Sequence, residues 1–184
     1  MVAPGAFVEE LAAARIGETF NQYAEGSRAA LLRMRLSGYL EEKGAARFLL
    51  VGEAPGCRGA RISGIPFTSE RQLTGSGPAE ATATVVHRVL GELGLEHEVF
   101  LWNVVPTHPG TETTNRTPTR TEIEGGLRFV NELAHSRSVV CVGRVAQAAI
   151  AGAPVRHPAH GGAKEFRSRL IELLDRGDLV PGPA

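Results

Sequence analysis

The chain has 184 residues, a hydrophobic fraction of 42% and no formal net charge, which fits one globular domain and excludes a globally basic surface for polyanions. Cys57 and Cys141 are the only cysteines, so a disulfide framework and a four-cysteine metal site are excluded. No apolar run approaches membrane-spanning length, and the first twenty residues lack a secretory signal pattern. We therefore expect a cytoplasmic protein that contacts no membrane.

Helical and strand patterns alternate along the chain. Apolar residues at helical spacing predict helices over residues 28–43, 85–93, 119–133, 144–151 and 166–174. Thr119 and Glu122 form a T-x-x-E capping box, which marks the start of the third of these helices. Short continuous apolar runs predict buried strands over residues 47–52, 98–105, 138–143 and 154–156.

This alternation is typical of an α/β fold whose parallel sheet is covered on both faces. We expect a three-layer sandwich with a central parallel sheet of about four strands flanked by helices. Residues 1–184 would form a single domain. Residues 1–25 would be a peripheral N-terminal extension and residues 176–184 a peripheral tail.

Three unusual loops follow the predicted strands, where open α/β folds bind their ligands. They are the glycine-rich loop after Val51, the loop after Asn103 and "HPAHGG" after Arg156. The first loop contains one carboxylate, Glu53, and ends in an aromatic residue, Phe67. Its glycines would let the backbone approach a ligand closely, yet it matches neither the P-loop nor G-x-G-x-x-G.

Two further polar residues stand at strand ends. The Asn103 amide can both donate and accept a hydrogen bond to a planar edge, or it can simply cap a turn. His157 is a candidate hydrogen-bond donor or acid–base group, or a polar surface residue.

Four segments in chain order resemble motifs of the uracil-DNA glycosylase superfamily. "GEAPG" (Gly52 to Gly56) resembles the first active-site motif of its iron–sulfur (family 4) branch, and "GIPF" ends in Phe67. "NVVP" with "NRTPT", between Asn103 and Thr119, is similar to a further motif, and "HPAHGG" resembles the second active-site motif. The resemblance implies a DNA glycosylase that flips a deaminated base, uracil foremost, out of DNA and hydrolyses its N-glycosidic bond.

The resemblance also implies residue roles. His157 would stabilise the leaving base, and Glu53 would act on the attacking water or the sugar. Phe67 would stack on the flipped base, and Asn103 would read its Watson–Crick edge. The backbone wall of the pocket would come from Gly52, Ala54, Pro55 and Gly56. Contacts to single- or double-stranded DNA are expected from Arg58, Arg61, Arg116, His160, Gly161 and Lys164, and also from Arg167.

The chain departs from that branch in two ways. The iron–sulfur branch uses four cysteines and this chain has two, so we expect no cluster and no cofactor. Acidic residues that follow GEAPG in that branch are replaced by Cys57, Arg58, Gly59 and Ala60, which leaves open which residue activates water.

We expect the protein to be a monomer. Two alternative functions stay open. One is a superfamily member acting on hypoxanthine or xanthine, and the other is a non-catalytic nucleic-acid- or nucleotide-binding module on the same fold.

Overall fold

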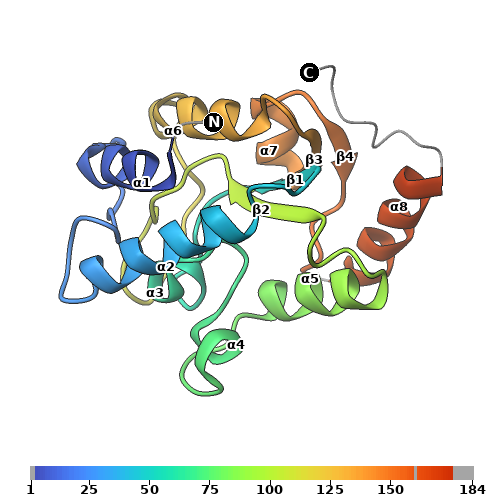
Figure 1. The fold of residues 1–184 in the computed structure, drawn as a ribbon, viewed down its shortest axis with the longest axis horizontal. Coiled ribbons are helices and arrows are strands. Elements are labelled where there is room, and N and C mark those ends of the chain that lie inside the picture. Colours follow the sequence, from blue (N-terminus) through green and yellow to red (C-terminus); the bar gives the residue numbers. More distant parts are fainter. Residues whose placement is uncertain (1–2, 160, 176–184) are drawn as a thin grey trace.

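The computed structural model describes residues 3–159 and 161–175, and its centre is a four-stranded parallel sheet (Figure 1). The strands are β1 (Phe48–Gly52), β2 (Val99–Asn103), β3 (Ser138–Val142) and β4 (Ala153–Val155), in the spatial order β2-β1-β3-β4. The expected parallel sheet of about four strands is confirmed.

Eight helices surround the sheet in the described part of the chain. They are α1 (Pro4–Ala13), α2 (Ala29–Glu42), α3 (Ala60–Ser63), α4 (Glu70–Thr74), α5 (Ala81–Glu92), α6 (Arg120–Ala134), α7 (Gly143–Ala149) and α8 (Ala163–Asp175). Thr119 caps α6 as its motif predicts: its side chain accepts a hydrogen bond from the Glu122 backbone, and its own N–H donates to the Glu122 carboxylate. The sequence patterns did not predict α1, α3 and α4.

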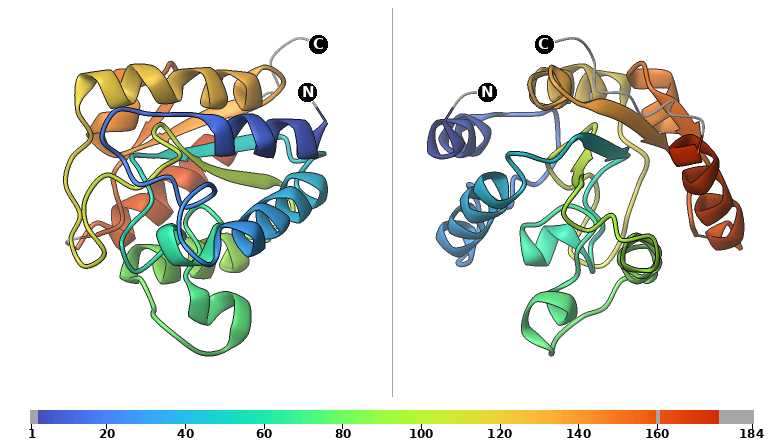
Figure 2. Two further views of the ribbon diagram at one scale, coloured as in Figure 1. Left: turned by 90° about the vertical axis from the view of Figure 1, so that its left-hand side faces the viewer. Right: turned by 45° about the vertical axis from the view of Figure 1, so that its right-hand side comes forward.

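Alternate residues of each strand face opposite layers, as the period of a strand requires. On β1, Leu49 and Val51 pack with α1, α2, α6 and α7, whereas Phe48 and Leu50 pack with α5 and α8. The two views of Figure 2 show these helices on the two sides of the sheet. The three-layer arrangement explains why the strands are continuous apolar runs.

The N-terminal segment corrects one expectation, because α1 is part of the core rather than peripheral. Phe7, Val8 and Leu11 are buried in the hydrophobic cluster that also contains Leu49 and Val51 of β1. The Phe7 ring lies edge-on to Trp102 and to Phe129, with ring centroids 5.6 Å apart in both pairs. The expected tail, residues 176–184, lies outside the described residues.

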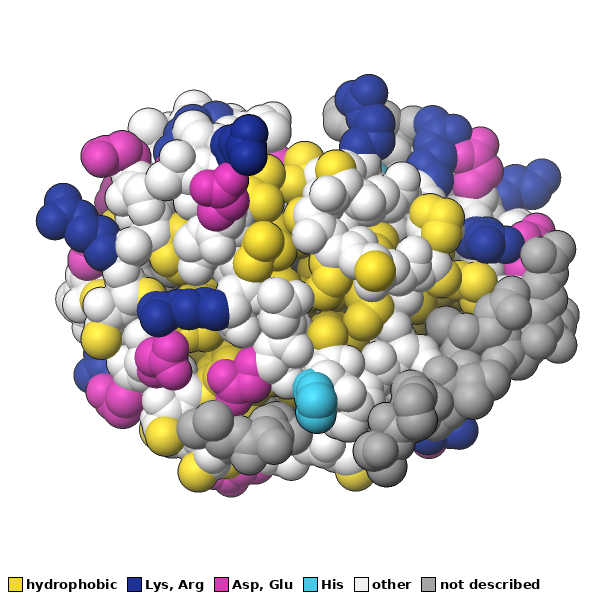
Figure 3. All heavy atoms as spheres, turned by 90° about the horizontal axis from the view of Figure 1, so that it is seen from above, with side chains coloured by type: hydrophobic (Ala, Val, Ile, Leu, Met, Phe, Trp, Pro, Cys, Tyr) yellow, Lys and Arg dark blue, Asp and Glu magenta, His cyan; other side chains and the backbone are white. Residues whose placement is uncertain are grey.

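The face that carries α6 has no single sign of charge. Figure 3 shows hydrophobic side chains over the middle of this face and charged side chains of both signs along its edges. This mixture agrees with the formal net charge of zero. Within the described residues, no helix is long and apolar enough to cross a membrane.

The strand register aligns the loops that follow the strands. Gly52 of β1 pairs with Asn103 of β2, Val51 pairs with Cys141 of β3, and Val142 pairs with Val155 of β4. All four carboxyl ends therefore meet at one edge of the sheet, where the three unusual loops converge.

Candidate active site

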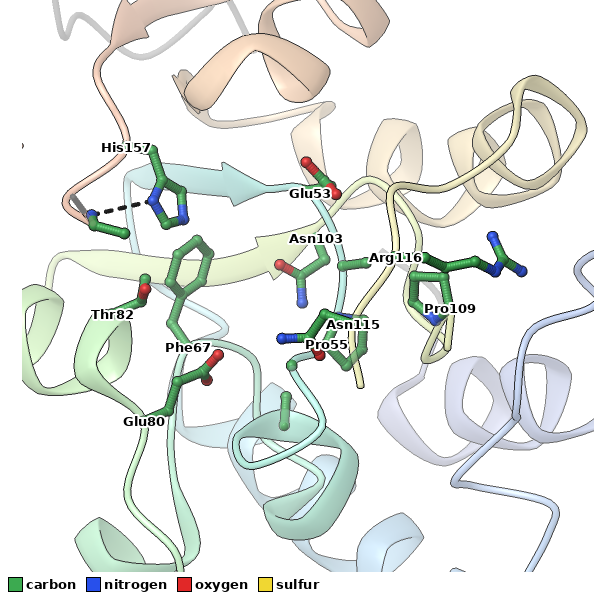
Figure 4. A pocket seen from close by; sticks show the side chains of 14 residues that line it. Glu53, Pro55, Phe67, Glu80, Thr82, Asn103, Pro109, Asn115, Arg116 and His157 are labelled. Atoms are coloured by element: carbon green, nitrogen blue, oxygen red, sulfur yellow. Dashed lines mark hydrogen bonds between the residues drawn. The ribbon is translucent and has the colours of Figure 1, made fainter. Parts of the chain in front are cut away.

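A cavity of about 370 Å³ opens at the carboxyl edge of the sheet (Figure 4). Glu53, Phe67, Asn103 and His157 all line it, although they come from three regions that lie far apart in the sequence. Ala54, Pro55 and Gly56 form part of its wall. A volume of this size is in the ordinary range for a small-molecule pocket.

Gly52 lies behind two of these side chains. A Cβ atom added there would overlap Phe67 Cζ and would lie 2.8 Å from Phe67 Cε2 and 2.9 Å from Asn103 Oδ1. Such distances are too short for real contacts. The glycine at the end of β1 therefore leaves the space in which the phenyl ring and the amide approach each other.

Phe67 is held in an unusual backbone conformation. Its φ angle is +53°, and it is the one described non-glycine residue with positive φ. The residue is 8% exposed. Ser63 fixes the preceding turn, because its hydroxyl donates to the Thr68 carbonyl at 2.6 Å and accepts from the Ile65 N–H at 3.1 Å. Strain of this kind costs about 1–3 kcal/mol and is concentrated at functional sites.

Asn103 presents an unused amide to the cavity. The residue is 4% exposed, and no described group forms a hydrogen bond with its side chain. Figure 4 shows the amide between Phe67 and the loop that contains Asn115. A nearly buried amide with free donor and acceptor atoms is suited to a planar ligand edge.

His157 is oriented by its own loop. Its Nδ1 atom accepts the Ala159 N–H at 3.2 Å, which favours the neutral tautomer with hydrogen on Nε2. A Cβ atom at Gly162 would overlap the His157 carbonyl, so the turn after the histidine requires glycine there. In Figure 4 the imidazole lies above the Phe67 ring and faces the cavity.

Glu53 is half-buried, and its side chain lies above that of Asn103 in Figure 4. Desolvation by burial raises the pKa of its carboxyl. Glu53 and His157 also line a neighbouring cavity of about 860 Å³ that contains Arg144 and Arg156. These two residues therefore stand between the small pocket and a wider surface hollow.

Sequence reasoning missed Asn115, which lines the pocket from the loop after β2. Its Oδ1 atom accepts the Cys57 N–H at 2.8 Å, so the amide ties this loop to the loop after β1. His108 connects the same two loops, because its Nδ1 atom lies 2.7 Å from the Pro55 carbonyl oxygen. Its Nε2 atom lies 2.8 Å from the Thr111 carbonyl oxygen. Asn115 belongs to the "NRTPT" segment, so its motif was the available signal.

Glu80 and Thr82 also line the pocket and were missed. They lie around the start of α5, and nothing in the surrounding sequence distinguishes them from an ordinary helix start. Only the folded chain brings them to the loop after β1.

The expected DNA-contacting residues separate into two groups. Arg116 lines the pocket, but its guanidinium donates two hydrogen bonds to the buried Glu122 carboxylate, at 2.7 and 2.6 Å, and points away from Asn103 (Figure 4). That pairing lowers the pKa of Glu122 to about 2. Arg61 lies outside the pocket, 4.9 Å above the Phe20 ring and 3.3 Å from the Glu112 carboxylate.

The other expected contacts are more available. Arg58 and Lys164 are exposed, and neither has a carboxylate partner within the described residues. Arg167 pairs with Glu92 at 3.0 Å. Gly161 adopts a φ angle of +81° in the turn after His157, and His160 lies outside the described residues.

The cysteines do not fit an iron–sulfur cluster. Cys57 and Cys141 are both buried and free; Cys57 lies in the loop between β1 and α3, and Cys141 lies in β3. In residues 3–159 and 161–175 no group of three or more His, Cys, Asp or Glu side chains could hold a metal ion. A cluster held by four thiolates has no ligand set here.

An open parallel sheet with a pocket at its carboxyl edge defines the class of α/β proteins that bind ligands beyond the ends of their strands. Residues 40–181 match the model of the uracil DNA glycosylase superfamily. The chain therefore belongs to the uracil DNA glycosylase superfamily. Membership supports a DNA glycosylase, a hydrolase that acts on DNA.

Two solved structures resemble the chain along nearly its whole length. SMUG2 from Pedobacter heparinus aligns with 97% of this chain and 99% of its own, at 11% identity and a TM-score of 0.67. UNG from Nitratifractor salsuginis aligns with 96% of each chain, at 14% identity and a TM-score of 0.46. At 11% identity the likeness to SMUG2 concerns the fold. No curated protein sequence matches the chain.

Proposed function

We propose that this protein excises uracil from DNA by flipping the base into the pocket of Phe67, Asn103 and His157 and hydrolysing its N-glycosidic bond. The observation that supports this most is the combination of an aromatic ring, an unpartnered buried amide and an oriented imidazole around one cavity. A binding module would not require all three to face one pocket.

Flipping a base out of DNA costs a few kcal/mol, because the base loses its stacking and its base pair. Contacts in the pocket must offset this cost. Stacking on Phe67 returns about 1–3 kcal/mol. The Asn103 amide then pairs with the exposed edge of the base, accepting from N3–H and donating to O4. These contacts suit uracil, whose edge offers one donor between two carbonyl oxygens.

Bond cleavage places negative charge on the leaving base and positive charge on the sugar. The Nε2–H of His157 donates to O2 of the departing uracil, as a donor in an oxyanion hole does. The Glu53 carboxylate balances the cationic sugar or orients the attacking water, much as carboxylates do in glycoside hydrolysis. Its raised pKa follows from burial near this reacting centre.

Contacts to the DNA backbone come from cations that the protein leaves free. Arg58 lies just after the first motif, Lys164 is the second residue of α8, and both are exposed. Arg116 instead holds its loop against α6 through Glu122, so we assign it a structural role.

The test is an excision assay on matched oligonucleotides that contain uracil, hypoxanthine, xanthine or ethenocytosine, in single and double strands. We expect free uracil as the main product. Release of hypoxanthine or xanthine without uracil would make this a superfamily member with another base. Tight binding without release of any base would make it a binding module.

A further inference from the structure

His108 is a buried titratable residue that the mechanism above does not use. The residue is 0% exposed, and both nitrogens of its ring lie within hydrogen-bonding distance of carbonyl oxygens. Nδ1 contacts Pro55 at 2.7 Å, and Nε2 contacts Thr111 at 2.8 Å. A carbonyl oxygen only accepts hydrogen bonds, and a neutral imidazole has only one N–H. Both contacts are therefore hydrogen bonds only when the ring is a doubly protonated imidazolium.

The two distances agree with a charged donor. Neutral N–H···O bonds are most often about 2.9–3.0 Å long, whereas charge-assisted ones are about 2.7–2.9 Å long. In a neutral ring, one contact would place the lone pair of a nitrogen against the lone pairs of a carbonyl oxygen. Loss of one proton to solvent therefore breaks one of the two bonds of His108.

No carboxylate holds the charge of this ring in the part of the chain that the structure describes. The segments that contact His108 are the loop after β1, the loop after β2 and the segment around Phe20. Their charged side chains are Glu18, Glu25, Glu53, Arg58, Arg61, Glu112 and Arg116. Arg61 pairs with Glu112, Arg116 pairs with Glu122, and Glu25 accepts the Asn21 N–H. Only carbonyl dipoles stabilise the imidazolium, and histidine is the side chain that ordinarily changes charge between about pH 5 and 8.

His108 joins the wall of the pocket to the rest of the fold. Its backbone N–H and carbonyl exchange hydrogen bonds with Phe20, both at 2.9 Å. Backbone hydrogen bonds between the loops after β1 and β2 reach as far as Val105, whose N–H donates to the Glu53 carbonyl at 3.0 Å. The next link along the first loop is the bond from His108 to Pro55, which lines the cavity. This bond therefore fixes the wall that follows Glu53.

The bond to Pro55 is the one that a neutral ring gives up. Thr111 lies only three residues from His108 in the same loop, so its bond is local. Neutral histidine generally favours hydrogen on Nε2, the nitrogen that contacts Thr111. Pro55 lies 53 positions away in the sequence, and it loses its donor when Nδ1 loses its proton.

We propose that doubly protonated His108 is a positioning residue that holds the Pro55 wall of the pocket, so that uracil excision weakens as rising pH removes the proton on Nδ1. This inference rests on the proposed excision of uracil. His108 does not itself line the cavity, so it acts on the bound base through Pro55.

The first measurement uses the unmodified protein. Nitrogen-15 NMR of the histidine rings distinguishes a protonated ring nitrogen from an unprotonated one, and the spectrum of His108→Gln identifies the signals of His108. Both nitrogens of His108 should be protonated at about pH 5.5, and only Nε2 should remain so at about pH 8.5. A neutral ring at the acid end would overturn the inference.

The second measurement is the pH profile of single-turnover uracil release for two variants that do not titrate. His108→Gln places an amide nitrogen near Nε2 and keeps the bond to Thr111, whereas His108→Asn places one near Nδ1 and keeps the bond to Pro55. Dividing the unmodified rate by the variant rate cancels the titration of Glu53 and His157. For His108→Gln this ratio should be about 10–100 at the acid end and fall toward one at the alkaline end, because a displacement of about 1 Å can cost about 100-fold. His108→Asn should keep most of the rate throughout.

His97→Gln is the matched control, because it changes an exposed histidine between α5 and β2 and should keep the unmodified profile. Thermal unfolding at each pH separates loss of the fold from loss of position. A ratio that does not change with pH, or equal losses in His108→Gln and His108→Asn, would overturn the inference while the proposed function stands. If the unmodified protein releases no uracil, the proposed function is wrong and the inference fails with it.

Discussion

Gly52→Ala perturbs the site by a single methyl group. The new Cβ would overlap Phe67 Cζ and lie 2.9 Å from Asn103 Oδ1. Carbon atoms in contact keep about 3.5–4.0 Å, so the end of the ring must retreat by about 1 Å. The backbone at Gly52 does not have a positive φ angle, so any effect of the alanine comes from steric crowding of Phe67 and Asn103.

The expected effect is much larger on catalysis than on folding. A displacement of about 1 Å in a reacting group can cost about 100-fold in rate. Loss of stacking alone, at about 1–3 kcal/mol, corresponds to roughly 5–150-fold. We expect single-turnover uracil release to fall about 10–100-fold. Overpacking should lower the free energy of unfolding by about 1–3 kcal/mol, which leaves the protein folded at 25 °C.

The assay compares uracil release with thermal unfolding for each variant. Gly38→Ala is the matched control, because nothing lies within 4 Å of a Cβ atom there and it sits within α2. In a double-mutant cycle, Gly52→Ala should cost much less once Phe67→Ala has removed the ring. An undiminished rate in Gly52→Ala, or additive effects in the cycle, would refute this account of the pocket.

Three other predictions follow from single contacts. His157→Ala should slow uracil release about 100–1,000-fold and slow 5-fluorouracil release less, since the fluorinated base is a better leaving group; equal slowing would assign His157 to positioning. Because Arg116 lowers the pKa of Glu122 to about 2, the pair contributes stability fully above pH 4.5 and loses it as the pH falls toward 2. Glu122→Gln keeps the capping box and should lower the free energy of unfolding at pH 7 by up to about 3 kcal/mol. Denaturant titrations at several pH values measure this difference from the unmodified protein, and it should vanish near pH 2. Arg58→Ala should reduce the salt dependence of DNA binding by about one unit of log–log slope, whereas the paired Arg61→Ala should leave it unchanged; equal slopes for both variants would contradict the phosphate contact.

Local patterns predicted the sheet and much of the pocket. The apolar runs of β1 and β2 require burial on both faces, and parallel strands place their ends at one edge. Glu53 directly follows β1 and Asn103 is the last residue of β2, so their meeting in one cavity could be anticipated. The capping box at Thr119 involves residues only three positions apart, so the sequence predicts it directly, and the structure contains it.

The remaining features depend on partners distant in the sequence. Arg61 pairs with Glu112 and covers Phe20, and no local pattern marks either contact. The glycines at 56 and 59 were interpreted as space for a ligand, but that space contains the Glu80 carboxylate. The core role of α1 was missed because Phe7 packs on residues more than 90 positions away.

The most direct test of the account is release of free uracil by the unmodified protein and by Asn103→Ala. Excess protein is mixed with a uracil-containing oligonucleotide, and free base and alkali-labile abasic sites are measured over time. The account predicts one uracil and one abasic site per oligonucleotide, with release slowed about 5–150-fold in Asn103→Ala and unchanged in Gly38→Ala. Absence of uracil release by the unmodified protein, or release that Asn103→Ala leaves unchanged, would contradict it.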